Sequence, residues 1–344
     1  MFDTLTVCLD MHGCNNRCKH CFLPHQVNPS RPLRDLDLIA KAFKPYAKRF
    51  CLYGWIRGID KEDDYKQRYE KEQAYSDISL HEHFSLVDAK RAANDDAYCM
   101  WLKSIGVIHA QLTFFGMETL TDWMSGRKGV FQEQLRASKR LFAHGIVPRW
   151  QYFLNQYTLK DVEAFVDLME KEGYLALSPP FSAFAHQGSC DGNNVQFYDA
   201  WLRHQDLKVI PKTLLTMTKA HYNETSLKAI FGMQETDLIE EYKYDESTHD
   251  PLKDASPIIY IDGSMRAYLH FTAYNEATYL GHVIHDGAKT IVTRLKTRDV
   301  TLLQLADTMK KADLVAQFGQ KSDKLFCADD WFDYLLFKAT HHQR

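Results

Sequence analysis

Hydrophobic and polar positions alternate from the start of the chain. In residues 4–10 (TLTVCLD), three apolar side chains at every second position are separated by polar or small ones. This period of two is typical of a strand. Short runs rich in apolar residues predict further strands at 49–54, 81–88, 109–116, 147–155 and 176–181.

Segments with helical spacing separate these strands. Residues 34–49 place Leu36, Ile39 and Phe43 on one face, and we expect Pro45 to end or bend this helix. Further helices are expected at 95–106, 131–144 and 162–173. Strands that alternate with helices predict parallel βα units. The fold class that follows is α/β, a partial (β/α)6 TIM-like barrel of parallel strands, with its chemistry at the carboxyl ends of the strands.

The second half of the chain has a different pattern. Helical periodicity dominates residues 195–245 and 301–344, and residues 257–271 have the pattern of a hairpin with Asp-Gly in its turn. We therefore predict a barrel core at 1–190 and a mixed α+β C-terminal extension at 191–344. Residues 55–78 are polar and dense in charge, which indicates an inserted, partly helical segment within the core.

Composition narrows the possible functions. The 344 residues are 45% hydrophobic and 25% charged, with a formal net charge of −3. This balance argues against a chain built mainly to bind nucleic acid or an anionic membrane. No run approaches the ~20 apolar residues of a membrane helix, and the start lacks the pattern of a signal peptide. We expect a cytoplasmic protein.

Cysteine usage fits that compartment, which keeps thiols reduced. Of the eight cysteines, five are scattered along the chain and are expected to be mostly free thiols. These five are Cys8, Cys51, Cys99, Cys190 and Cys327.

The other three cysteines form a group. Cys14, Cys18 and Cys21 lie in CNNRCKHC, directly after the first predicted strand. A structural zinc site usually takes four ligands in paired C-x2–4-C halves, and a ferredoxin cluster takes four cysteines. Three thiolates on a 4Fe–4S cube would leave one iron open for a substrate or cofactor. The alternatives are a zinc site completed by His12, His20 or His25, or a chance cluster of cysteines.

This loop resembles the signature of the radical S-adenosylmethionine superfamily, C-x3-C-x-aromatic-C. His20 occupies the aromatic position and Phe22 follows the last cysteine. The resemblance implies that Cys14, Cys18 and Cys21 each bind one iron of a single 4Fe–4S cluster. S-adenosylmethionine would chelate the fourth iron, and one electron would cleave it to methionine and a 5′-deoxyadenosyl radical. Such enzymes are oxygen-sensitive and take electrons from a donor such as flavodoxin or ferredoxin.

Residues 111–155 resemble the middle of enzymes in the SPASM/twitch lineage of that superfamily. The resemblance implies that Thr113 contacts the cofactor ribose and that Arg127 binds its carboxylate, for which a fixed fork of donors is suited. Gln151, on the fifth predicted strand, would reach the ribose or the methionyl part. As sequence features alone, Thr113 is also a good strand former and Arg127 an ordinary surface charge.

Two departures from the family pattern stand out. The family usually carries Gly-Gly-Glu after its second strand, to hold the cofactor's amino group, whereas this chain has LYGWIRG there. Gly116-Met117-Glu118 follows the fourth strand instead, so Glu118 is a candidate replacement, with backbone carbonyls near Tyr53 and Gly54 as the alternative. The C-terminal hairpin also lacks the cysteine of a SPASM or twitch domain, which indicates a degenerate module without an auxiliary cluster.

The expected reaction is hydrogen abstraction from a small molecule or a peptide side chain. A chain that begins almost at its first strand is not expected to carry an N-terminal leader-peptide domain. Without an auxiliary cluster, redox-neutral chemistry such as epimerisation or rearrangement is favoured, or quenching by a hydrogen donor such as Cys190. The rival hypothesis is a non-catalytic zinc or iron–sulfur binding module.

Overall fold

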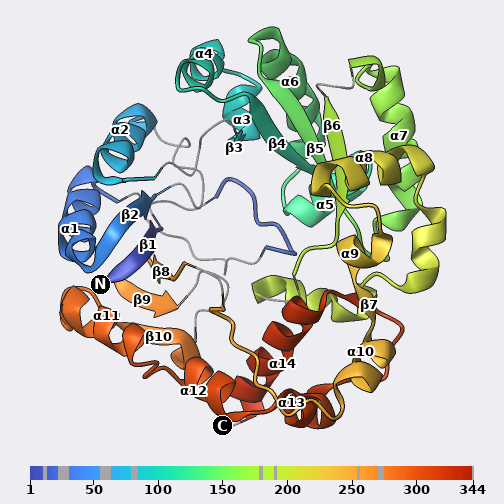
Figure 1. Cartoon of the computed structure of the whole chain (residues 1–344). Helices are drawn as coiled ribbons and strands as arrows, with labels where there is room; N and C mark the ends of the chain where they lie inside the picture. Colours follow the sequence, from blue (N-terminus) through green and yellow to red (C-terminus); the bar gives the residue numbers. More distant parts are fainter. Residues whose placement is uncertain are drawn as a thin grey trace.

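The computed structural model describes most of the chain, and helices surround its strands in an α/β arrangement (Figure 1). The described residues are 1–10, 14–21, 31–54, 63–78, 84–177, 181–189, 192–253, 256–269 and 275–342. Phe22 and Cys190 lie outside them, as do His12 and His25.

The first sheet joins the two ends of the chain. Its strand order is β10-β9-β8-β1-β2, and β1 pairs in parallel with both β2 and β8. The hairpin predicted at 257–271 is confirmed as the antiparallel pair β8 and β9. It lies beside β1 and so extends the sheet that carries the cysteine loop. The division of the chain into a barrel core at 1–190 and an extension at 191–344 stays a prediction. The strands are β1 (Phe2–Leu9), β2 (Ala47–Tyr53), β8 (Ile258–Ile261), β9 (Arg266–Leu269) and β10 (Tyr279–His282).

The second sheet is wholly parallel, with the order β3-β4-β5-β6. Its strands are β3 (Phe84–Leu86), β4 (His109–Phe114), β5 (Val147–Phe153) and β6 (Ser182–His186). The alternation of strands and helices is therefore confirmed, and the described residues form an open, partial barrel. The position predicted for the sixth strand, 176–181, is wrong. Leu175–Leu177 forms a short 3-10 turn, and two prolines follow, which cannot donate to a strand ladder.

Side chains from a helix cover the outer edge of β2. The backbone N–H of Phe50 donates to Asp77 Oδ2 over 2.9 Å, and that of Leu52 donates to Ser76 Oγ, also over 2.9 Å. Further along, Gly54 N–H donates to Glu72 Oε2 over 2.9 Å. Helix α2 (Tyr65–Tyr75) and the residues after it thus occupy the place where a third strand would pair. Among the described strands, β2 and β3 accordingly belong to separate sheets.

Helices form the outer layer around the strands. Those of the barrel core are α1 (Leu33–Phe43), α2, α3 (Ala89–Ala92), α4 (Asp96–Ser104), α5 (Glu118–Ser125), α6 (Val130–Ala143) and α7 (Val162–Lys171). The later ones are α8 (Lys212–Tyr222), α9 (Leu227–Phe231), α10 (Glu235–Tyr242), α11 (Gly287–Lys296), α12 (Thr301–Thr308), α13 (Lys311–Phe318) and α14 (Ala328–His342). Figure 1 shows α10 and α12 to α14 closing the lower side of the molecule.

The strand pattern decides which side chains face the barrel interior. In β4, Ala110, Leu112 and Phe114 are fully buried in the hydrophobic core shared with the helices. Gln111 and Thr113 alternate with them and so point to the opposite face. The polar side chains of β4 therefore face the barrel interior, where they can bind a ligand.

The C-terminal elements pack around one buried acid. Glu235 is fully buried, and its carboxylate accepts hydrogen bonds from Tyr198 (2.6 Å), Ser322 (2.6 Å) and Trp331 (3.0 Å). The short antiparallel pair β7 (Met233–Gln234) and β11 (Leu325–Phe326) lies next to it. This network ties the last helix to the start of α10.

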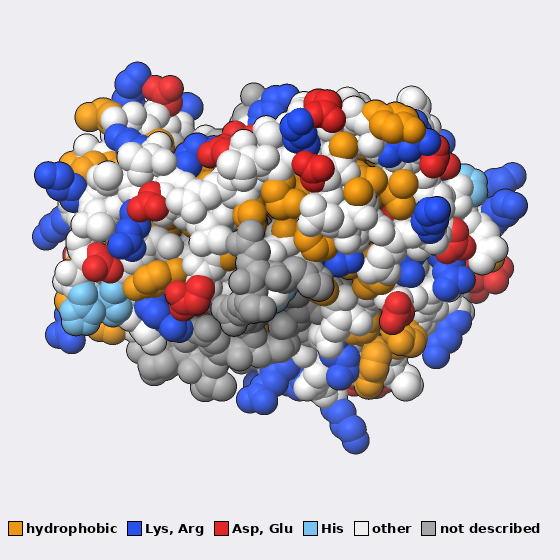
Figure 2. All heavy atoms as spheres, turned by 90° about the horizontal axis from the view of Figure 1, so that it is seen from below, with side chains coloured by type: hydrophobic (Ala, Val, Ile, Leu, Met, Phe, Trp, Pro, Cys, Tyr) orange, Lys and Arg blue, Asp and Glu red, His pale blue; other side chains and the backbone are white. Residues whose placement is uncertain are grey.

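The face seen in Figure 2 carries charges of both signs among scattered hydrophobic side chains. None of the described helices is both long enough and apolar enough to cross a membrane.

Candidate cofactor site

The cysteine loop lies at the carboxyl end of β1, as the motif predicts. Two backbone hydrogen bonds fix it to the last turn of α5, from Arg17 N–H to Ser125 O (2.9 Å) and from Lys19 N–H to Met124 O (2.8 Å). Gly126, directly after α5, has a φ of +66°, and a Cβ there would come within 2.6 Å of Arg17 O. Glycine is thus required both by the backbone conformation and by the close approach of the loop.

The three loop cysteines line one cavity of about 260 Å³. Burial, and then the neighbouring Cys14 and Cys21, raise the pKa of the Cys18 thiol above its ordinary value. Its thiol also interacts with the Ser125 hydroxyl on α5. Three thiols that line one cavity suit an iron–sulfur cluster, which is held by thiolates. Within the described part of the chain, no three His, Cys, Asp or Glu side chains are grouped to hold a single metal ion.

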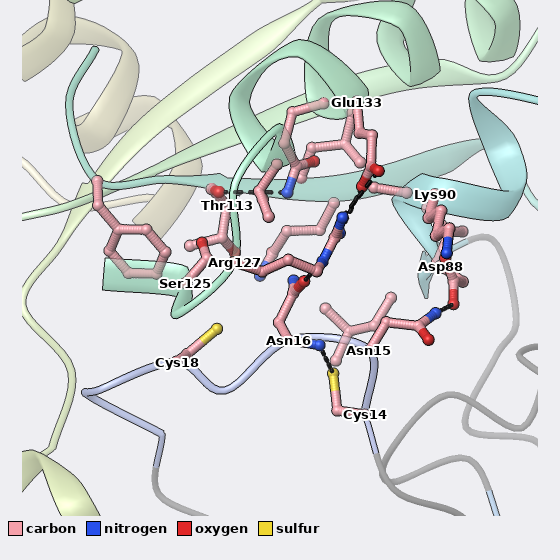
Figure 3. A pocket seen from close by; sticks show the side chains of 18 of the residues that line it. Cys14, Asn15, Asn16, Cys18, Asp88, Lys90, Thr113, Ser125, Arg127 and Glu133 are labelled. Carbon is pink, nitrogen blue, oxygen red and sulfur yellow. Dashed lines mark hydrogen bonds and ion pairs between the residues drawn. The ribbon is translucent and has the colours of Figure 1, made fainter. Parts of the chain in front are cut away.

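Arg127 connects the loop to the helix layer (Figure 3). Its guanidinium forms a bidentate ion pair with Glu133 on α6, with Nη1 at 2.8 Å from Oε1 and Nη2 bound to Oε2. Its Nε donates to Asn16 Oδ1 in the cysteine loop over 3.1 Å. The hydrogen bonds that Arg127 donates to Glu133 are the main cause that raises the pKa of Arg127. The side chain is therefore a fixed positive charge at the cavity wall.

A second polar connection joins the loop to the region after β3. Asn15 Nδ2 donates to Asp88 Oδ2 over 2.5 Å, and the other oxygen of Asp88 caps α3 by accepting the Arg91 N–H. Asp88 and Lys90 both line the cavity. Charges of both signs therefore surround the space beside the three thiols.

Thr113 and Gln151 are brought together on neighbouring strands. The Thr113 hydroxyl donates to Gln151 Oε1 over 2.9 Å, and Gln111 Nε2 donates to the same oxygen over 3.0 Å. Gln111 and Thr113 line the cavity, and Gln151, which pairs with Thr113 on β5, is not among its lining residues. A hydroxyl held in this way has a fixed orientation.

His20 packs between two aromatic rings. Its ring centroid lies 4.6 Å from that of Phe115 and 4.3 Å from that of Phe153. His20 and Phe115 line the cavity. The imidazole thus fills the aromatic position of the motif as a packed ring.

The structure does not bring Gly116 and Glu118 to this cavity. Glu118 is exposed on the first turn of α5, and its carboxylate accepts a hydrogen bond from Gln132. Gly116, with a φ of +128°, makes the turn after β4, where a Cβ would lie 2.7 Å from Asp161 Oδ2. Among the described residues, Glu72 reaches the end of β2 from α2 and accepts the Gly54 N–H. Sequence reasoning does not reveal this, because Glu72 is 18 residues from the strand end that it binds.

Sequence reasoning also misses several residues that line the cavity. Asp88 carried a usable signal, because an acid between a strand and a helix is a typical helix cap. No sequence pattern indicated Asn16 or Glu133, because their roles depend on the fold around Arg127. The additional polar lining residues are Asn15, Asn16, Asp88, Lys90, Gln111, Ser125, Glu133 and Gln134.

Comparison with solved structures supports the fold. No protein-family model matches the chain, and no curated protein matches it. The structure of native anSMEcpe with bound AdoMet aligns with a TM-score of 0.54 over 98% of each chain, at 12% sequence identity. The structure of anSMEcpe with AdoMet and the Kp18Cys peptide aligns with a TM-score of 0.55 over 99% of this chain and 98% of that one, at 11% identity.

A peptide-bound structure from Streptococcus suis is also similar. SuiB bound to its precursor peptide SuiA aligns with a TM-score of 0.50 at 12% identity, over 95% of this chain and 75% of that one. At these identities the likeness concerns the fold. This chain therefore has the fold of anSMEcpe and SuiB.

Proposed function

We propose that this chain is a radical S-adenosylmethionine enzyme that abstracts hydrogen from a peptide or small-molecule substrate. The observation that carries the proposal is that Cys14, Cys18 and Cys21 line one cavity together with Arg127 and Thr113. Three thiols, a fixed cation and an oriented hydroxyl are the parts that the family resemblance implies at one place.

Cys14, Cys18 and Cys21 would hold one 4Fe–4S cluster. When bound, that cluster supplies the electron that cleaves S-adenosylmethionine reductively. The thiols must be deprotonated to bind iron, so cluster assembly releases the protons that burial holds on a group such as Cys18.

The charged side chains of the cavity would hold the cofactor's zwitterionic end. Arg127 would attract the carboxylate, and its fork stays oriented through Glu133. Asp88 would accept from the amino group, a role that the structure gives no support for assigning to Glu118. Thr113 would hydrogen-bond the ribose, oriented by Gln151.

A peptide is the substrate class that we propose. The solved structures of similar fold include anSMEcpe with a bound Kp18Cys peptide and SuiB with its precursor peptide SuiA. We also propose that the overall reaction is redox-neutral, or that it ends when a hydrogen donor such as Cys190 quenches the substrate radical. The C-terminal module would then act without an auxiliary cluster.

Anaerobic reconstitution with iron and sulfide tests the proposal. We expect about four iron atoms per chain, and 5′-deoxyadenosine after addition of dithionite and S-adenosylmethionine. The triple variant C14A/C18A/C21A should lose both, while Cys99→Ala, at a buried cysteine of the helix layer, should keep both. Stoichiometric zinc without cofactor cleavage would establish the rival binding module instead.

A further inference from the structure

One buried side chain of the cofactor cavity has an unused hydrogen-bond acceptor. Gln134 on α6 lines the cavity and is only 6% exposed. Its Nε2 donates to the backbone oxygen of Thr113 over 3.4 Å, which is the dashed line at Thr113 in Figure 3. Its Oε1 is buried and accepts no hydrogen bond from the described part of the chain. A buried acceptor without a donor is costly, so a donor on the molecule that fills the cavity would remove that cost.

Apolar side chains line the same cavity. Val130 is buried and lies four residues before Gln134, so the two side chains share one face of α6. Leu112, on the core face of β4, and Val87, after β3, line the cavity as well. A flat and largely apolar group that carries one polar edge suits such walls together with a single amide.

The proposed cofactor has such a group. S-adenosylmethionine carries three kinds of hydrogen-bond donor, which are its amino group, its ribose hydroxyls and the six-amino group of its adenine. In the proposed function, Asp88 accepts from the amino group and Thr113 bonds the ribose. The six-amino group of the flat adenine ring is the donor that remains.

The amide of Gln134 also matches the atoms beside that amino group. Adenine places the acceptor nitrogen N7 next to its six-amino donor, and a glutamine amide can bond both atoms at once. The Nε2 of Gln134 has two hydrogens, and the hydrogen bond to Thr113 O uses one of them. The second hydrogen and the unused Oε1 therefore form the donor and acceptor pair that this edge of adenine needs.

We propose that Gln134 recognises the adenine of S-adenosylmethionine. Its Oε1 accepts a hydrogen of the six-amino group, and its Nε2 donates to N7, while Val130 and Leu112 give apolar contact to the ring. The inference rests on the proposed function, because that function puts a nucleotide in this cavity.

Two nucleotides test this assignment by binding, without turnover. The probes are S-adenosylhomocysteine and S-inosylhomocysteine, in which a carbonyl oxygen replaces the six-amino group, titrated anaerobically into the reconstituted protein by calorimetry. We expect the parent chain to bind the adenosyl probe at least about tenfold more tightly, because the carbonyl would place two acceptors against each other. In Gln134→Met, which keeps the side-chain length without the amide, we expect this ratio to fall to within about twofold.

Gln132→Met is the matched control. It makes the same exchange two residues earlier on α6, at an exposed position outside the cavity lining, and should keep the ratio of the parent chain. Thermal unfolding without nucleotide gives a second readout. Gln134→Met should unfold at the parent temperature or above it, because the exchange removes a buried acceptor that has no donor.

The outcomes separate this inference from the proposed function. A parent chain that binds neither probe and does not cleave S-adenosylmethionine with dithionite overturns the proposed function. Cleavage by the parent chain combined with equal affinity for the two probes overturns the adenine assignment alone. An unchanged ratio in Gln134→Met, with both probes weakened equally and a lower unfolding temperature, would assign Gln134 a packing role and also overturns it.

Discussion

Arg127 donates its Nε hydrogen to Asn16 Oδ1 over 3.1 Å, and this contact links residues 111 positions apart in the chain. The other guanidinium nitrogens bind Glu133. One side chain thus fixes the relative position of the cysteine loop and α6.

Replacing Arg127 by lysine tests this role. Lysine keeps the charge but lacks the planar fork that binds both oxygens of Glu133 and Asn16 at once. We expect the R127K variant to bind S-adenosylmethionine about tenfold to a hundredfold more weakly, since charge-assisted hydrogen bonds contribute about 1.5–3 kcal/mol. Isothermal titration of the reconstituted protein measures this. Arg136→Lys, at an exposed position of α6, is the matched control. Equal affinities for the two variants would contradict the role.

Gly126 and Gly129 offer a matched pair for the cysteine loop. Both have a positive φ, but only at Gly126 does an added Cβ meet the loop, 2.6 Å from Arg17 O, whereas nothing lies within 4 Å at Gly129. Both alanine variants bear a backbone cost of about 1–3 kcal/mol. We expect Gly126→Ala alone to displace the loop and to reduce iron incorporation several-fold. Iron content reports the displacement of the loop, and thermal unfolding reports the backbone cost. A normal iron content in Gly126→Ala would show that the loop tolerates displacement.

The covered edge of β2 predicts a stability effect. In the double variant S76A/D77A, the backbone N–H groups of Phe50 and Leu52 lose their side-chain acceptors. Each buried group left unsatisfied costs about 1–3 kcal/mol. Urea unfolding should therefore show a loss of about 2–6 kcal/mol, with little change for Ser104→Ala at an exposed helix position. A loss below about 1 kcal/mol would mean that water or another group replaces these acceptors.

His186 predicts a pH dependence of stability. Burial lowers its pKa to about 4, while the unfolded chain keeps an ordinary histidine pKa of about 6.5. Between these values the unfolded state binds more protons, so the free energy of unfolding falls as the pH drops from 6.5 towards 4. His186→Gln should flatten this fall, whereas His285→Gln, at an exposed position, should not. Urea unfolding at pH 7, 6 and 5 measures the slopes, and parallel curves for all three proteins would refute the assignment.

Gly232 predicts a severe packing effect in the C-terminal region. A Cβ at this residue would lie 1.8 Å from Phe326 O, where the backbones meet beside the β7 and β11 pair. Gly232→Ala must separate those backbones and so disturb the hydrogen bonds that the nearby Glu235 carboxylate accepts. We expect a loss of more than about 3 kcal/mol and early proteolytic cleavage near β11. Gly173→Ala is the control, because its φ is also positive but its surroundings are open. Similar unfolding curves for both variants would count against this packing.

Local patterns in the sequence determined much of this protein. Alternation of apolar and polar positions predicts β1, β4 and β5, because each strand packs one face against helices. The spacing of Cys14, Cys18 and Cys21 predicts that they share one site, because a loop of eight residues cannot separate them far. These features depend on neighbours close in the chain.

Contacts between distant segments were decided by the tertiary structure alone. No local pattern shows that Glu72, Ser76 and Asp77 cover the edge of β2, or that β8 pairs beside β1. The same holds for the link from Arg127 to Asn16, and for Glu118, the candidate replacement for the family's acid, which is exposed and does not line the cavity. The physical reason is that a side chain's partners depend on how whole elements pack, and packing is a property of the assembled chain.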